Sequence, residues 1–107
     1  MATKRVMLVC AAGMSTSLLV ANMKKSAANQ GKDYEIFAVA LSDVAGKLND
    51  TQPDVVLLGP QVSYLKDEVK NQTDIHKIPM AVMNMIDYGT MNGDNILKMA
   101  ETLLKDN

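Results

Sequence analysis

Short apolar runs constrain the fold of this chain more than any other feature of its sequence. Residues 6–9 (VMLV) and 55–58 (VVLL) contain no polar residue. Strands buried on both faces of a parallel sheet have this composition, because helices cover the sheet on both sides. Each run is followed by apolar residues at helical spacing. Strands that alternate with helices in this way predict an α/β fold.

Four strands and four helices are predicted in alternation. We expect the strands at residues 6–9, 34–41, 55–58 and 78–83, and the helices from about residues 15, 42, 62 and 92. Pro79 cannot donate a hydrogen bond within a sheet, which places the fourth strand at an edge. Right-handed crossovers then favour a four-stranded parallel sheet of order 2-1-3-4, with helices on both faces in a three-layer sandwich. With 107 residues, the chain is predicted to form one domain spanning residues 1–107.

The predicted strand order also indicates where a ligand would bind. In open parallel sheets, ligands bind beyond the carboxyl ends of the strands, at the point where the strand order reverses. Here that point lies between the first and third strands. We therefore expect Cys10, which follows the first strand, to lie beside Gly59, Pro60 and Gln61, which follow the third.

Charge and composition exclude several classes of function. The chain has 11 basic and 12 acidic residues and no basic cluster, so neither nucleic acid nor an anionic membrane surface is an expected partner. Its single cysteine cannot form an intramolecular disulfide. No signal-peptide pattern or apolar run of about 20 residues is present, which predicts a cytoplasmic protein that is not inserted into a membrane.

Residues 10–17 (CAAGMSTS) form the segment with the clearest chemical pattern. A loop that leaves a buried strand and enters a helix has backbone N–H groups free to bind a phosphate-sized anion, and the helix dipole adds to their effect. The small side chains of Ala11, Ala12 and Gly13 leave room for such an anion, and the hydroxyls of Ser15, Thr16 and Ser17 can add donors. The same environment favours a thiolate at Cys10.

A second interpretation of this segment needs no chemistry. Cys10 could pack as a small apolar residue, as free cysteines often do, while Ser15 or Thr16 caps the helix. The sequence pattern alone leaves both interpretations open.

A reactive Cys10 would be compatible with three chemistries. Thiol redox chemistry usually needs a C-x-x-C pair, but residue 13 is glycine. A phosphatase of the low-molecular-weight type needs an arginine six residues after the cysteine, where this chain has Thr16. A phosphoryl carrier needs neither, and the absence of that arginine prolongs the life of a phosphocysteine. The residues therefore favour a carrier over a hydrolase.

Two stretches resemble a known family, namely residues 7–20 (MLVCAAGMSTSLLV) and 54–64 (DVVLLGPQVSY). They are similar to the enzyme IIB components of the lactose/cellobiose (chitobiose) class of the bacterial phosphoenolpyruvate-dependent sugar phosphotransferase system, and the match covers essentially the whole chain. The resemblance implies a four-stranded parallel sheet flanked by helices. It also implies that Cys10 accepts a phosphoryl group, held mainly by main-chain amides of the segment from Cys10 to Ser17, including Met14.

The resemblance implies partners as well. The phosphoryl donor would be a histidine of a IIA protein, and the acceptor a sugar, usually a β-linked disaccharide, held by the membrane-embedded IIC component. The protein would then be cytoplasmic and peripheral to the membrane through IIC, with no metal or organic cofactor, and a monomer. Two other functions stay open, a regulatory IIB-like binding domain and a phosphatase-like hydrolase. The particular sugar is not encoded in a recognisable pattern of this chain.

Several further residues are candidates for the surroundings of the site. Met14, Val62 and Tyr64 could form an apolar rim that docks both partners, although Val62 and Tyr64 could equally begin a core-facing helix, and for Tyr64 we expect core packing. Asp87 and Tyr88 are expected in a turn after the fourth strand. His76 is expected at the surface, at the end of the sheet opposite Cys10. Apart from this apolar docking rim, we predict that Gly59, Pro60, Gln61, Val62 and Tyr88 form the rim of the site itself.

Overall fold

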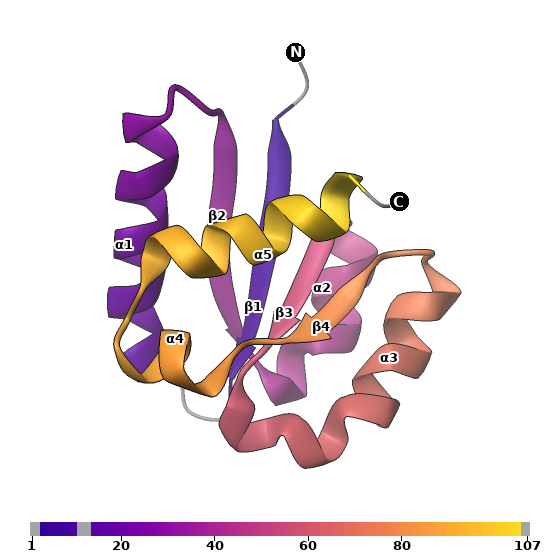
Figure 1. Cartoon of the computed structure of the whole chain (residues 1–107). Helices are drawn as coiled ribbons and strands as arrows, with labels where there is room; N and C mark the ends of the chain where they lie inside the picture. Colours follow the sequence, from indigo (N-terminus) through magenta and orange to yellow (C-terminus); the bar gives the residue numbers. More distant parts are fainter. Residues whose placement is uncertain (1–2, 11–13, 106–107) are drawn as a thin grey trace.

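Four parallel strands form the central sheet of the computed structural model, which describes residues 3–10 and 14–105 (Figure 1). The strands are β1 (Lys4–Cys10), β2 (Tyr34–Ala40), β3 (Val55–Leu58) and β4 (Met80–Val82), and their order is β2-β1-β3-β4. Every pairing is parallel. The predicted order and the edge position of the fourth strand are therefore confirmed.

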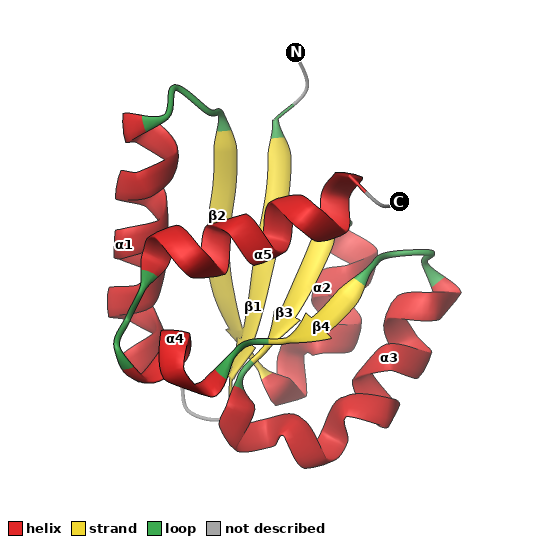
Figure 2. Ribbon diagram, in the orientation of Figure 1, coloured by secondary structure: helices red, strands yellow, loops and turns green. Residues whose placement is uncertain are grey.

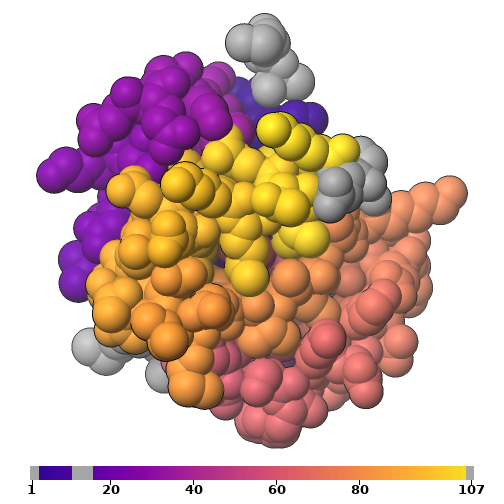
Figure 3. Space-filling model, in the orientation of Figure 1, coloured from indigo at the N-terminus to yellow at the C-terminus, as the bar shows by residue number. Residues whose placement is uncertain are grey.

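Helices cover both faces of this sheet, as Figure 2 shows. On one face lie α1 (Met14–Asn29) and α5 (Gly93–Lys105), and on the other lie α2 (Val44–Asp50) and α3 (Lys66–Ile75). In Figure 3, the side chains of α5 lie across the face that is turned to the viewer. The described residues also form three shorter elements, the 3-10 helices η1 (Leu41–Asp43) and η2 (Pro60–Leu65) and the five-residue helix α4 (Met85–Gly89).

Strand β1 is apolar throughout residues 6–9 because both of its faces are buried. Val6 and Leu8 lie in the core cluster under α1 and α5, whereas Met7 and Val9 lie in the cluster under α2 and α3. All four side chains are fully buried. Burial of each such side chain contributes about 1.5–3 kcal/mol, so a polar residue at any of these positions would be costly. The three-layer arrangement predicted from the sequence is confirmed.

Some predicted elements differ from the observed ones. Helix α1 begins at Met14, one or two residues earlier than expected, and Leu18 in its second turn is exposed. Leu18 lies about 100° around the helix from the buried Leu19, which places it off the sheet. Strand β4 is shorter than residues 78–83, because Pro79 can only accept, as it does from the Val56 N–H at 3.0 Å.

The segment predicted as a turn around Asp87–Gly89 is the helix α4. Its first turn is capped by the Asn84 side chain, whose Oδ1 accepts hydrogen bonds from the backbone N–H of Ile86 at 2.9 Å and of Asp87 at 3.1 Å. Capping of this kind allows so short a helix to form in spite of the nearby glycine. The prediction of a plain turn was therefore wrong.

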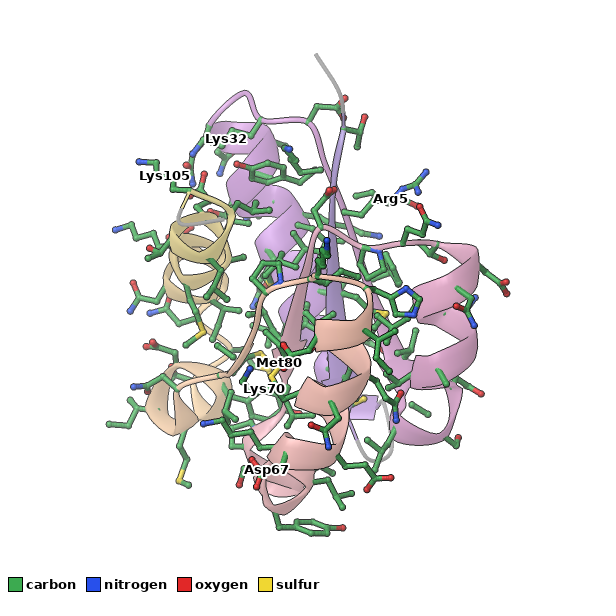
Figure 4. The ribbon with its side chains drawn as sticks, turned by 90° about the vertical axis from the view of Figure 1, so that its right-hand side faces the viewer. Arg5, Lys32, Asp67, Lys70, Met80 and Lys105 are labelled. Carbon is green, nitrogen blue, oxygen red and sulfur yellow. The ribbon has the colours of Figure 1, made fainter. Side chains whose placement is uncertain are left out.

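A polar cluster ties α5 to the beginning of β2. The Tyr34 hydroxyl donates to Glu101 at 2.8 Å, and the Lys32 ammonium pairs with the same carboxylate. Figure 4 shows Lys32 at the top of the view, in the loop that precedes β2. Burial, followed by the hydrogen bond to Glu101 and its negative charge, raises the pKa of Tyr34 to about 12. Burial by itself would raise the pKa of Glu101. The hydrogen bonds from Lys32 and Tyr34 have the larger combined effect, and the net result is a pKa below the ordinary value of 4.5.

Candidate functional site

The carboxyl ends of the strands bring the predicted site residues together. Cys10 is the last residue of β1 and pairs with Ala40 of β2. On its other side, Gly59 follows β3 directly and its N–H donates to the Val9 carbonyl at 2.8 Å. The predicted proximity of Cys10 and Gly59 is thus confirmed. At this edge, the start of α1, the η2 segment and α4 lie around the strand ends (Figure 1).

The Cys10 side chain is buried in this structure. It is 1% exposed, and its Sγ contacts the Val39 carbonyl oxygen at 3.8 Å as a weak hydrogen-bond donor. Burial is what the packing interpretation predicts, while the position at the end of β1 is what both interpretations predict. A reaction partner can reach the sulfur only when the atoms that cover it move aside.

The segment after Cys10 is described from Met14 onwards. Ala11, Ala12 and Gly13 lie outside the described residues, as do the side chains of Met14 and Ser15. Helix α1 starts four residues after Cys10, so the positive end of a 16-residue helix is close in sequence to the sulfur. Of the remaining predicted hydroxyls, Thr16 is fully buried and Ser17 is exposed.

Three side chains from separate segments meet beside this helix start. The Thr16 Oγ1 and Tyr88 Oη atoms are 3.2 Å apart at hydrogen-bond distance, and the Gln61 Nε2 donates to Tyr88 Oη at 2.9 Å. We call Thr16, Gln61 and Tyr88 the hydroxyl cluster. It joins α1, η2 and α4. The sequence indicated each residue separately, but nothing in its pattern indicated that a tyrosine from residue 88 bonds a threonine from residue 16.

Only some of the predicted rim residues line a surface hollow at this end of the sheet. Pro60, Gln61, Met85, Tyr88 and Gly89 line a mostly apolar hollow of about 300 Å³. A Cβ atom at Gly59 would be 2.6 Å from the Gln61 Oε1, so a side chain there would displace the end of the Gln61 side chain.

Two residues after Gly59 lie elsewhere than expected. Val62 packs in the core with α2 and α3 rather than in the rim. Tyr64 is 79% exposed, so the prediction of core packing was wrong. The chain forms a 3-10 helix here, with a kink at Val62 (φ −116°, ψ 20°), and α-helical spacing therefore does not apply.

Arg5 and Asp87 are both engaged with other residues. Arg5, the only arginine of the chain, lies at the opposite end of β1, about 17 Å from Cys10 along the strand. It pairs there with Glu35 at 3.0 Å and donates to the Thr51 carbonyl at 2.6 Å. Asp87 accepts a hydrogen bond from Asn95 of α5 at 3.0 Å, which ties its carboxylate to that helix.

His76 is exposed, beyond the end of α3 and on the side of the sheet away from Cys10, as predicted. Within the described residues, no three histidine, cysteine or carboxylate side chains are grouped so as to hold a metal ion. Across residues 3–10 and 14–105, no helix is long and apolar enough to cross a membrane.

Comparison with known proteins identifies the class of this fold and site. The family described as "PTS system, Lactose/Cellobiose specific IIB subunit" matches residues 5–99. A cellobiose-specific EIIB component of Lactococcus lactis subsp. lactis (strain IL1403) is 53% identical over 107 residues, covering 97% of this chain and 99% of the relative. A galactose-specific EIIB component of Lactococcus lactis subsp. cremoris (strain MG1363) has the same identity and coverage. An oligo-beta-mannoside-specific EIIB component of Bacillus subtilis (strain 168) is 41% identical over 101 residues, 94% of this chain and 96% of the relative.

Solved structures agree with this assignment. The solution structure of a cellobiose-specific phosphotransferase IIB component from Borrelia burgdorferi superimposes with a TM-score of 0.81 at 36% identity, covering 98% of this chain and 94% of that one. A lactose-specific IIB component domain from Streptococcus pneumoniae has a TM-score of 0.80 at 15% identity, covering 94% and 97%, and supports the fold alone. The chain belongs to the lactose/cellobiose-specific IIB subunits of the sugar phosphotransferase system. It is thus a component of a phosphotransferase, as the resemblance implied.

Proposed function

We propose that the protein is a phosphoryl carrier in which Cys10 receives a phosphoryl group from a IIA histidine and passes it to a sugar held by a membrane IIC component. The observation that carries this proposal is the position of the only cysteine of a IIB-family chain at a strand end beside the start of α1. Backbone N–H groups at a helix start stabilise an anion, and they stabilise both a thiolate and the phosphoryl group that it carries.

Two displacements at phosphorus make up the reaction. In the first, the Cys10 thiolate attacks the phosphorus of the donor phosphohistidine, an S–P bond forms, the N–P bond breaks, and the histidine nitrogen keeps the electron pair. In the second, a sugar hydroxyl attacks the same phosphorus, the S–P bond breaks and the thiolate leaves, while the hydroxyl proton passes to solvent. Because Cys10 is buried, docking of the donor must first uncover the sulfur.

The charges around the site support a carrier rather than a hydrolase. Hydrolysis is accelerated by an arginine that neutralises the transferring phosphoryl group, and the only arginine is engaged at the far end of β1. A carboxylate could activate water, but Asp87 is turned to Asn95. A phosphocysteine in these surroundings would persist until an acceptor arrives.

Exposed apolar side chains around the site support docking of protein partners. Tyr64, Met85 and Ile86 are each more than two-thirds exposed, and Leu18 is more than half exposed. They belong to η2, α4 and the start of α1, the elements that border the carboxyl end of the sheet. Exposed apolar side chains gathered in one region indicate a protein interaction surface. We propose that IIA and IIC bind this region in turn.

The sugar of this chain is proposed only as a class. Two relatives with the same 53% identity carry names for different sugars, cellobiose and galactose, so overall identity does not select between them. We propose a β-linked disaccharide of the cellobiose type. Transfer assays with membranes that contain the cognate IIC, supplied in turn with cellobiose, lactose and galactose, will identify the acceptor.

Labelling with radioactive phosphoenolpyruvate tests the carrier proposal. With the general phosphotransferase proteins and IIA present, the wild type is expected to take up label and the Cys10→Ser variant to take up none. The control is His76→Ala, which removes the only histidine and is expected to keep the full label. Retention of label by Cys10→Ser, or its loss in His76→Ala, contradicts a phosphocysteine.

A chase with sugar and IIC membranes separates the carrier from the two other functions. A carrier loses its label to the sugar. Label that stays on Cys10 indicates a regulatory domain, whereas release of inorganic phosphate without sugar indicates a hydrolase.

A further inference from the structure

We propose that Tyr88 is a positioning residue for phosphoryl transfer, and that its hydroxyl holds Thr16, and with it the first turn of α1, in place beside Cys10. The inference rests on the proposed function of Cys10. In it, the hydroxyl cluster holds the anion-binding end of α1 at a fixed position relative to the sulfur.

The burial of Thr16 is the first observation. Its side chain is fully buried in the first turn of a helix that starts four residues after Cys10. A buried hydroxyl without a hydrogen-bond partner is unfavourable, and the Tyr88 hydroxyl supplies such a partner at 3.2 Å from a residue 72 positions away. The position of this turn of α1 therefore depends on the position of Tyr88.

The second observation is that Tyr88 is itself held from several sides. Its hydroxyl accepts from Gln61 of η2 at 2.9 Å, and its ring packs against the core cluster under α1 and α5. Helix α4, which carries it, is capped by Asn84 and tied to α5 through Asp87 and Asn95. A tyrosine held in this way can fix the position of the neighbouring Thr16, because its own ring and hydroxyl are restrained.

The third observation links the cluster to the segment after β3. A Cβ atom at Gly59 would be 2.6 Å from Gln61 Oε1 and 3.2 Å from the carbonyl oxygen of Val9. A side chain at residue 59 would therefore displace the end of the Gln61 side chain from its observed position beside Tyr88. Gly59 contacts β1 next to Cys10, so the same few residues connect the sulfur, η2 and α4.

Phosphoryl transfer is sensitive to this kind of connection. Its catalysis consists almost entirely of positioning and electrostatic stabilisation, and a displacement of about 1 Å can slow an enzyme reaction by about 100-fold. Loss of one hydrogen bond that restrains the first turn of α1 is expected to have a smaller effect, of about tenfold.

The test measures the rate of phosphoryl transfer from IIA to Cys10 as a function of IIA concentration. Tyr88→Phe keeps the ring and removes the hydroxyl. We expect its maximal rate to fall about tenfold, with the half-saturating IIA concentration unchanged, because docking is intact. Thr16→Val is expected to match it, and Thr16→Ser, which keeps the hydroxyl, to retain the wild-type rate. The double variant Tyr88→Phe/Thr16→Val should be no slower than either single variant, because both remove the same interaction.

Tyr34→Phe is the matched control. It also removes a tyrosine hydroxyl with a hydrogen-bond partner, Glu101, but at the opposite end of the sheet. We expect it to change stability without changing the rate. A Tyr88→Phe protein that transfers at the wild-type rate overturns the inference, and so does a Tyr34→Phe protein that is slowed equally.

Gln61→Ala guards against misfolding of the other variants. Gln61 is exposed, so its removal leaves the core intact while it frees Tyr88 on one side. An intermediate slowing supports the inference, and a wild-type rate contradicts it. Wild-type protein that takes no label on Cys10 overturns the proposed function and this inference with it, whereas labelled wild type with an unaffected Tyr88→Phe variant overturns the inference alone.

Discussion

Gly93 allows α5 to approach α1 more closely than any other residue type would. A Cβ atom at this position would be 2.6 Å from the carbonyl carbon of Asn22, 2.8 Å from its oxygen and 2.8 Å from the nitrogen of Met23. All three are backbone atoms of α1, so no side-chain rotation can relieve the contact. We predict that Gly93→Ala destabilises the protein by forcing the two helices apart.

The magnitude follows from the geometry. Ordinary contact begins at 3.4 Å, so the helix backbones must separate locally by about 0.8 Å. A gap of this size forfeits about a quarter to a half of the dispersion energy across an interface. The buried interface includes Met23 on α1 and Ile96, Leu97 and Ala100 on α5. Overpacked cores lose about 1–3 kcal/mol, and we expect a loss of about 2 kcal/mol here.

Thermal unfolding followed by circular dichroism measures this effect. For a domain of this size, a loss of about 2 kcal/mol lowers Tm by about 10 °C. The control is Gly46→Ala in α2, where an added Cβ atom meets nothing within 4 Å. Alanine is favoured over glycine within a helix by about 0.5–1 kcal/mol, so Gly46→Ala is expected to raise Tm. If Gly93→Ala melts at the wild-type temperature, the close approach of α1 and α5 is not a constraint on this fold.

Three further predictions concern the polar cluster around Glu101 and the docking region. Because the folded pKa of Tyr34 is raised to about 12, the stability that its neutral form contributes is complete below pH 10.0 and is lost as the pH rises from 10.0 to about 12. Tyr34→Phe should lack this loss in urea titrations across that range. The pKa of Glu101 is lowered below 4.5, so its carboxylate stabilises the fold at neutral pH and this contribution is lost as the pH falls through the folded pKa. The difference in unfolding free energy between wild type and Glu101→Gln should therefore shrink below pH 4.5. For docking, Ile86→Ser is expected to weaken IIA binding in calorimetric titrations, whereas Ile75→Ser, equally exposed at 78% against 74% but at the far end of α3, is expected to bind like wild type. Equal weakening by both variants would contradict a docking region at the carboxyl end of the sheet.

The fold could be predicted from the sequence because its signals are local and repeated. Continuous apolar runs occur where a strand must be buried on both faces, as at residues 6–9, and Pro79 excludes a central position for β4. Together with the handedness of crossovers, these signals leave few strand orders to choose from. The position of Cys10 beside Gly59 then follows from the strand order without any knowledge of side-chain contacts.

The errors arose where long-range packing or an unusual backbone overrode a local pattern. We expected Tyr64 to pack in the core, but it points to solvent, because the chain between Gly59 and Lys66 forms a 3-10 helix with a kink. Asp87–Gly89 has the composition of a turn, yet Asn84 caps it into a helix. Single-residue propensities of this kind are weak and tertiary context readily outweighs them.

The sequence by itself determined the class of fold, the strand at whose end the sulfur lies, and the absence of an arginine that would favour hydrolysis. Only the tertiary structure decided that Cys10 is buried and that Arg5 is engaged far from it. It also decided that Thr16 and Gln61 both form a hydrogen bond with the Tyr88 hydroxyl. The physical reason is the range of the interactions. Periodic burial and backbone restrictions act on neighbouring residues and leave a pattern in the sequence, whereas a hydrogen bond between residues 16 and 88 depends on how two distant elements pack, and no local pattern records it.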